Sequence, residues 1–140
     1  MFDKILLPTD GSEFSEHEVE RAIKALSDDG EIIILSVAIK LDTTTPFHGK
    51  NVAKMNKEFL QEAHENVNSM ASRFDKHVNV RKMVKIGIPS DTIVEVAEEE
   101  DVDLIIISAS GKSGLHKFFI GSVAERVLKT TERDVLLIHN

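Results

Sequence analysis

Five short apolar runs recur along the chain, separated by longer stretches in which apolar and polar residues alternate with helical spacing. The runs cover residues 4–8, 31–39, 78–86, 104–107 and 134–139. Short runs rich in Ile, Val and Leu are typical of strands that are covered on both faces, as in parallel sheets. The pattern therefore predicts five strands at these positions.

The stretches between the runs predict four helices, at about 13–27, 52–74, 89–100 and 121–131. We expect the first helix to end at the sequence Asp28, Asp29 and Gly30. The second and longest helix carries one apolar stripe: Val52, Met55, Phe59, Ala63, Val67, Met70 and Phe74. Most such stripes cover a sheet, so we expect this one to face the core, with a partner-binding face as the alternative.

Strands that alternate with helices imply right-handed crossovers. We therefore predict an α/β protein with a single doubly wound domain over residues 1–140, in which helices cover both faces of a five-stranded parallel sheet. No internal repeat or linker interrupts the pattern. In such sheets ligands bind beyond the carboxyl ends of the strands. The connections after the first and fourth strands are therefore the expected binding region.

Charge and composition narrow the classes of function. The net charge of −7 disfavours a nucleic-acid partner, because Lys and Arg neutralise phosphates in such complexes. No apolar stretch is long enough for membrane insertion, and the amino terminus has no secretory pattern, so we expect a cytoplasmic protein. The chain has no cysteine, and its six histidines are not paired at the spacing of metal ligands. We therefore predict no metal site.

The connection after the fourth strand has the composition of a phosphate-binding loop. Gly111 and Gly114 permit a tight bend, and Gly121 and Ser122 open a helix whose free N–H groups suit an anion. Ser122 and Glu125 also match a capping box, which is the competing interpretation of this segment. Ser15 and Glu18 match a capping box at the start of the first helix, with Ser12 as a rival start. Asp10, after the first strand, is either a polar ligand contact or only a turn residue.

Several standard motifs are absent. The Gly-Lys-Ser sequence at 111–113 is not a P-loop, because the earlier glycine of that motif falls on Ile106. No Gly-x-Gly-x-x-Gly follows any strand, and no Ser-His-Asp or Cys-His set is evident. We therefore assign no catalytic residue.

Taken in order along the chain, these features resemble the universal stress protein family. They are ILLPTDGSE at the amino terminus, the long helix, Gly-Ile-Pro at 87–89 and the connection after the fourth strand. The resemblance covers essentially the whole chain and implies an adenine nucleotide alpha hydrolase-like fold. ATP-binding members carry a Gly-x2-Gly-x9-Gly-Ser/Thr pattern. Here Gly111, Gly121 and Ser122 match it, whereas Ser108 replaces the first glycine, and its Cβ is expected to crowd the nucleotide or restrict the backbone.

The resemblance implies a set of ligand contacts. Asp10 would meet the adenine or ribose, Val37 the adenine edge, and Ser108 the ribose and phosphates. Lys112 would neutralise phosphate charge or remain a solvated lysine. The complete expected site is Pro8, Thr9, Asp10, Val37, Ser108, Gly111, Lys112, Gly121, Ser122 and Val123. The expected ligand is ATP with Mg²⁺ or Mn²⁺, and the sequence leaves open whether AMP or a cyclic nucleotide competes with it.

The resemblance also implies a homodimer that forms through the last strand, at Val135 to Ile138. The expected function is an ATP-binding regulatory module of the stress response that acts on an unknown protein partner. Two alternatives stay open: an ATP-independent interaction protein, which Ser108 favours, and a slow ATP hydrolase, for which the sequence offers no evident base.

Overall fold

The computed structural model describes residues 1–12, 15–42, 51–109 and 121–139. The elements follow one another as β1 (Phe2–Pro8), α1 (Ser15–Ala25), β2 (Leu26–Ala38), α2 (Val52–Ala71), β3 (Asn79–Ile86), α3 (Pro89–Glu99), β4 (Leu104–Ser108), α4 (Ser122–Thr130) and β5 (Asp134–Ile138). All five strands pair in parallel, in the order β3-β2-β1-β4-β5. The predicted α/β architecture with a five-stranded parallel sheet is confirmed.

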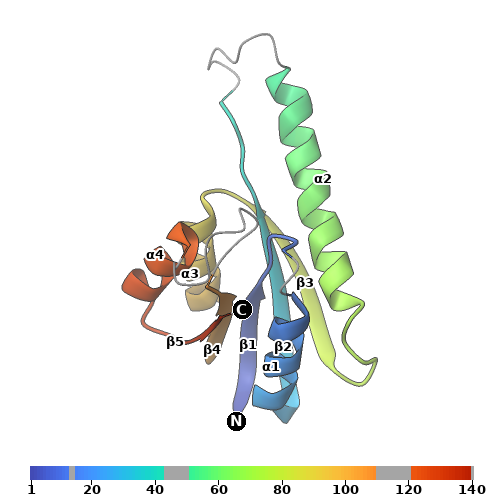
Figure 1. Cartoon of the computed structure of the whole chain (residues 1–140), viewed down its shortest axis with the longest axis vertical. Helices are drawn as coiled ribbons and strands as arrows, with labels where there is room; N and C mark the ends of the chain where they lie inside the picture. The colour runs from blue at the N-terminus through green and yellow to red at the C-terminus, as the bar shows by residue number, and fades with distance from the viewer. Residues whose placement is uncertain (13–14, 43–50, 110–120, 140) are drawn as a thin grey trace.

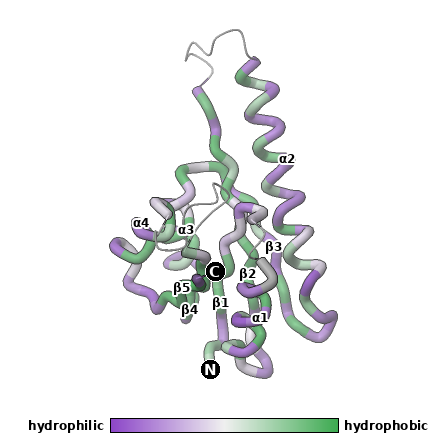
Figure 2. The backbone as a smooth tube through the Cα atoms, viewed as in Figure 1, coloured by the Kyte–Doolittle hydropathy of each residue, from purple (hydrophilic) through white to green (hydrophobic). Residues whose placement is uncertain are grey.

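Alternate residues of each strand build two separate cores. Ile5 and Leu7 of β1 face α1 and α2, where Val67 and Met70 are buried. Leu6 of the same strand faces the opposite layer, formed by α3 and α4. Figure 1 shows these two helix layers on either side of the sheet. The central strands β1 and β4 are hydrophobic along most of their length because both of their faces are covered, while the helices alternate in hydropathy (Figure 2). The edge strand β3 contains both apolar and charged residues.

The apolar stripe of α2 divides in two. Ala63, Val67, Met70 and, just beyond the helix, Phe74 are buried, and the last three belong to the core beside the sheet. Met55 and Phe59, nearer the amino end, are only half-buried, and Figure 1 shows this end of α2 extending beyond the sheet. Val52, at the first position of the helix, is also buried but belongs to neither core cluster. The core-facing interpretation therefore holds for the carboxyl-terminal half of the helix.

The end of α1 differs from the prediction. Leu26 to Gly30, expected as the last turn of the helix and its stop signal, already belong to β2. Leu26 pairs with Phe2 across a bulge in the β1–β2 ladder, and the Ser27 hydroxyl donates to Asp3 Oδ1 at 2.6 Å. Pairing with β1 therefore overrides the local turn signal.

The order of the strands fixes where a ligand would bind. From β1 the chain runs outward to β2 and β3, and then returns to β4 and β5 on the other side of β1. The direction of winding thus reverses between β1 and β4, so the connections at their carboxyl ends diverge and leave a crevice.

Candidate functional site

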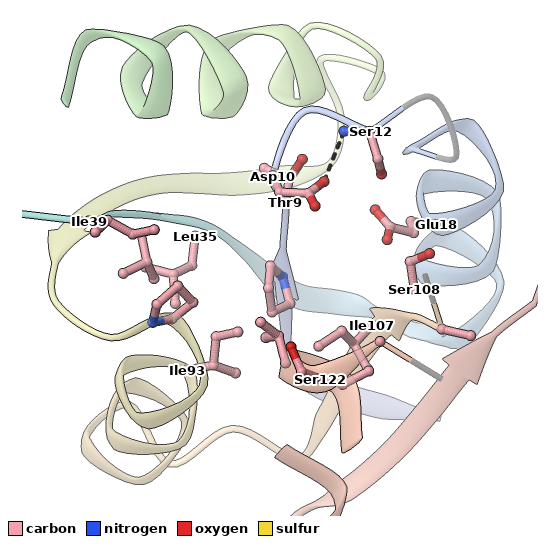
Figure 3. A pocket seen from close by; sticks show the side chains of 17 residues that line it. Thr9, Asp10, Ser12, Glu18, Leu35, Ile39, Ile93, Ile107, Ser108 and Ser122 are labelled. Carbon is pink, nitrogen blue, oxygen red and sulfur yellow. Dashed lines mark hydrogen bonds between the residues drawn. The ribbon is translucent and has the colours of Figure 1, made fainter. Parts of the chain in front are cut away.

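A cavity of about 340 Å³ opens at this crevice. It lies over the carboxyl ends of β1, β2 and β4 and beside the amino ends of α3 and α4 (Figure 3). Its wall is formed by Pro8, Thr9, Asp10, Ser12, Glu18, Leu35, Val37, Ile39, Pro89, Ile93, Ile107, Ser108, Ala109, Gly121, Ser122, Val123 and Ala124. Eight of the ten residues expected from the sequence are brought together here. The other two, Gly111 and Lys112, lie outside the described residues.

The two sides of the cavity differ in chemistry. Leu35, Ile39 and Ile93 form an apolar side, whereas Asp10, Ser12, Glu18 and Ser108 gather on the other (Figure 3). The apolar side draws on β2, on the residue that follows it and on α3. It suits a flat, apolar group, and the opposite side suits a group that carries hydrogen-bonding hydroxyls or charge.

The loop after β1 holds Asp10 at the mouth of the cavity. The Thr9 N–H donates to the Leu35 carbonyl at 2.8 Å, which ties the loop to β2. The Asp10 carboxylate accepts from the Ser12 N–H at 2.9 Å (Figure 3). Gly11 between them has φ +82°, in the left-handed region that favours glycine. Asp10 therefore forms the turn and also lines the cavity, and its contact with a ligand stays a prediction.

The amino end of α4 points its first turn at the cavity. Gly121 is the N-cap residue, and among the described residues no side chain makes a capping hydrogen bond at this end. Glu125 bonds Lys129 Nζ at 2.8 Å instead. The capping-box interpretation of Ser122 and Glu125 is therefore wrong, because Ser122 is already inside the helix. Helix geometry leaves the N–H groups of the first turn without a partner inside the helix.

Gly121 lines the cavity with an ordinary backbone conformation, φ −62° and ψ 155°, which any residue adopts. Gly111 and Gly114, where the sequence predicts a tight bend, lie outside the described residues. Ser108 is the last residue of β4 and pairs with Ile138 of β5 in a regular ladder. Its Cβ therefore does not restrict the backbone.

Glu18 is the residue that the sequence interpretation misplaced. Its side chain is 3% exposed and lines the cavity from α1. The Ser108 N–H donates to its carboxyl, so Glu18 does not serve as the cap suggested by its spacing from Ser15. Burial, and next the nearby Asp10 carboxylate, raise the pKa of Glu18 to about 8. The carboxyl is therefore mostly neutral at pH 7.

The remaining missed residues form the apolar side and the floor of the cavity. Three separate parts of the fold contribute these residues, which are Leu35, Ile39, Ile93 and Ile107. In the sequence each is an apolar residue of the kind found in any core or on any surface. Only the strand order brings them to one crevice. A second cavity of about 170 Å³ lies between the β1–α1 loop and the α2 region, where Asn66 and Arg73 contribute to its wall.

Comparison with known proteins identifies the group to which this architecture belongs. The model of the universal stress protein family matches residues 1–139. The chain belongs to the universal stress protein family. Universal stress protein MJ0531 of Methanocaldococcus jannaschii is 34% identical over 146 residues, which cover 99% of this chain and 82% of the relative.

Solved universal stress proteins extend the comparison to structure. Protein MJ0577 of M. jannaschii superimposes with a TM-score of 0.82 at 30% identity, over 99% of this chain and 96% of the other. A family member in complex with cAMP gives 0.60 at 26% identity, over 99% and 97%. More distant structures from Arabidopsis thaliana and Archaeoglobus fulgidus contain AMP and dAMP, and their identities of 15% and 21% show the shared fold alone. Relatives of this chain thus bind nucleotides.

No helix in the described part of the chain is long and apolar enough to cross a membrane.

Proposed function

We propose that the cavity binds an adenine nucleotide and that the protein is a nucleotide-responsive regulatory module of the stress response. One observation carries this proposal: an apolar side and the amino end of α4 share one cavity at the reversal point of the sheet. The apolar side suits a purine, because flat aromatic groups bind where water is excluded. The α4 N–H groups and their dipole suit a phosphate.

The polar residues between these two features suit the sugar. Asp10 and Ser108 lie at the carboxyl ends of adjacent strands, β1 and β4, and offer a carboxylate and a hydroxyl to ribose hydroxyls. We propose ATP as the ligand, with Mg²⁺ or Mn²⁺ carried on its phosphates. Gly111 and Lys112 would then meet the phosphates. AMP and cAMP are the competitors to test, since relatives of this chain bind them.

Calorimetric titration of the purified protein with Mg-ATP, AMP and cAMP tests this function. The wild-type protein is expected to bind, and Gly121→Val to lose binding while keeping its fold. The valine side chain would occupy space in the cavity, and the backbone conformation at Gly121 tolerates it. Ala53→Val, at an exposed position of α2, is the matched control and should bind normally. Unchanged affinity in Gly121→Val would place the phosphate elsewhere. No heat from any nucleotide at millimolar concentration would favour an ATP-independent interaction protein.

We also propose that the protein forms a homodimer through β5. The sheet has two edges. The edge strand β3 carries Arg81, Lys82 and Lys85, and lysines on an edge discourage pairing. The edge strand β5 presents half-buried Val135, Leu136 and Leu137 and no lysine. A second copy would cover this apolar edge.

We propose that a bound nucleotide changes the surface around the cavity and that a partner protein recognises this change.

A further inference from the structure

The carboxyl of Glu18 is the one buried ionisable group among the described residues of the cavity wall. Its side chain is 3% exposed, on the inner face of α1, and it reaches the cavity beside Asp10 and Ser108 (Figure 3). A carboxyl in such a place costs free energy when it is charged, unless a cation compensates it. The groups around the carboxyl therefore decide whether it is protonated.

The neighbours of Glu18 supply one hydrogen bond and one negative charge. From β4, the Ser108 N–H donates to the carboxyl and favours the ionised form. From the β1–α1 loop, the Asp10 carboxylate opposes that form. The strand β4 itself contains no charged residue.

None of the other charged groups on the elements around α1 is among the causes that shift the pKa of Glu18. On the part of α1 whose side chains are described, His17, Glu20, Arg21 and Lys24 are exposed, and Lys24 pairs with Glu20. At the amino ends of β1 and β2, opposite the cavity, lie Asp3, Lys4, Asp28, Asp29 and Glu31. Lys4 donates to the Glu100 carbonyl, and Glu31 pairs with Arg81. Arg73 borders the second cavity. Among the described residues, no cation compensates Glu18.

An anionic ligand adds a further negative charge to this corner. A phosphate at the α4 end shares a cavity of about 340 Å³ with Asp10 and Glu18. Repulsion between charges is strong in a wall of low dielectric, so the ligand favours the neutral form of Glu18. The neutral acid also gains an O–H donor that can meet a ligand oxygen, while its other oxygen keeps the Ser108 N–H.

We propose that Glu18 contacts the nucleotide as a neutral acid, so that nucleotide binding is linked to proton uptake at this residue. The inference rests on the proposed nucleotide-binding function and adds its regulation. Linkage is reciprocal: alkaline pH weakens nucleotide binding, and bound nucleotide raises the pKa of Glu18. The pKa of about 8 in the free protein places this coupling just above neutral pH.

The composition of the chain removes two kinds of side chain that would otherwise titrate between pH 7.5 and 9.5. The protein has no cysteine and no tyrosine, and the phosphate of AMP is already a dianion in this range. Calorimetry with AMP is performed in two buffers of different ionisation enthalpy. Above pH 8 the affinity of the wild-type protein should fall by up to about tenfold per pH unit, with proton uptake on binding.

Two variants isolate the residue. Glu18→Gln keeps the shape of the side chain and stays neutral, so its AMP affinity should be flat over this range, without proton uptake at this site. Glu20→Gln, exposed on the same helix, should behave as the wild-type protein does. A ¹³C NMR titration of the Glu18 carboxyl gives a direct readout, with a midpoint near pH 8 that moves upward when AMP is added.

The outcomes separate the two proposals. If AMP binds with an affinity that is flat in pH, or if the carboxyl titrates in the ordinary glutamate range, the proton linkage is wrong and the binding function stands. If AMP, cAMP and Mg-ATP all fail to bind the wild-type protein at every pH, both proposals fall. The NMR titration uses the wild-type chain, so it decides the state of Glu18 even if Glu18→Gln does not fold.

Discussion

Replacing Glu18 with Gln should stabilise the protein, by an amount that grows with pH. The substitution keeps the size of the side chain and an acceptor for the Ser108 N–H, and it removes the buried charge. The pKa of Glu18 is about 8 in the folded protein, against an ordinary value of 4.5. The folded state therefore holds a proton that the unfolded chain releases between these values.

This difference sets both the sign and the magnitude. The favourable contribution of the protonated carboxyl is complete below pH 4.5 and is lost as the pH rises through 8. The loss is at most about 1.4 kcal/mol per pH unit, so it reaches about 3 kcal/mol at pH 7 and about 5 kcal/mol above pH 8. Glu18→Gln does not undergo this loss of stability, because its amide side chain does not ionise. We expect it to match the wild-type protein at pH 4 and to exceed its free energy of unfolding by these amounts at higher pH.

Urea unfolding at a series of pH values between 4 and 9 measures the difference. Far-UV circular dichroism is the suitable signal, because the chain has neither tryptophan nor tyrosine. Other carboxyls titrate in both proteins and cancel in the comparison. The exposed Glu20→Gln should show no pH-dependent difference. A gap between Glu18→Gln and the wild-type protein that stays constant from pH 5 to 9, or a variant that is less stable at pH 8, would refute the reasoning.

Two further predictions concern the β1–α1 loop and the free edge of the sheet. Gly11→Ala should lower the free energy of unfolding by about 1–2 kcal/mol in urea titrations, because φ is +82° and the added Cβ would lie 2.5 Å from Asn66 Oδ1; equal stability would show that the loop relaxes freely. Leu137→Lys should convert the proposed dimer into a monomer in light-scattering chromatography, whereas Met83→Lys, on the opposite edge strand and packed against the same core, should leave it dimeric. A wild-type protein that is monomeric at micromolar concentration would remove the dimer proposal.

Local patterns were sufficient for the order of the elements and for much of the site. Strands that follow one another through helices must run parallel, and their carboxyl ends meet at one edge of the sheet. Asp10 and Ser108 follow or end predicted strands, so the sequence pattern alone places them at the same edge. The same reasoning placed the first-turn residues of α4 at this edge of the sheet.

Two capping patterns show where local reasoning failed. Ser15 with Glu18, and Ser122 with Glu125, both fit a motif whose members are three residues apart. In the fold, Glu18 turns to the Ser108 N–H and Glu125 turns to Lys129. A glutamate side chain is long enough to reach several partners, and the packing of each helix decides which one it meets.

The sequence by itself determined the parallel α/β architecture and the loops that border the crevice, because hydrophobic periodicity and turn residues act over short distances. Only the tertiary structure decided that Leu26 to Gly30 form a strand, that Ile39 and Ile93 share one wall, and that the Glu18 carboxyl is buried beside Asp10. These features depend on contacts between residues far apart in the chain. Burial and charge proximity, which set the state of Glu18, exist only after the helices have packed on the sheet.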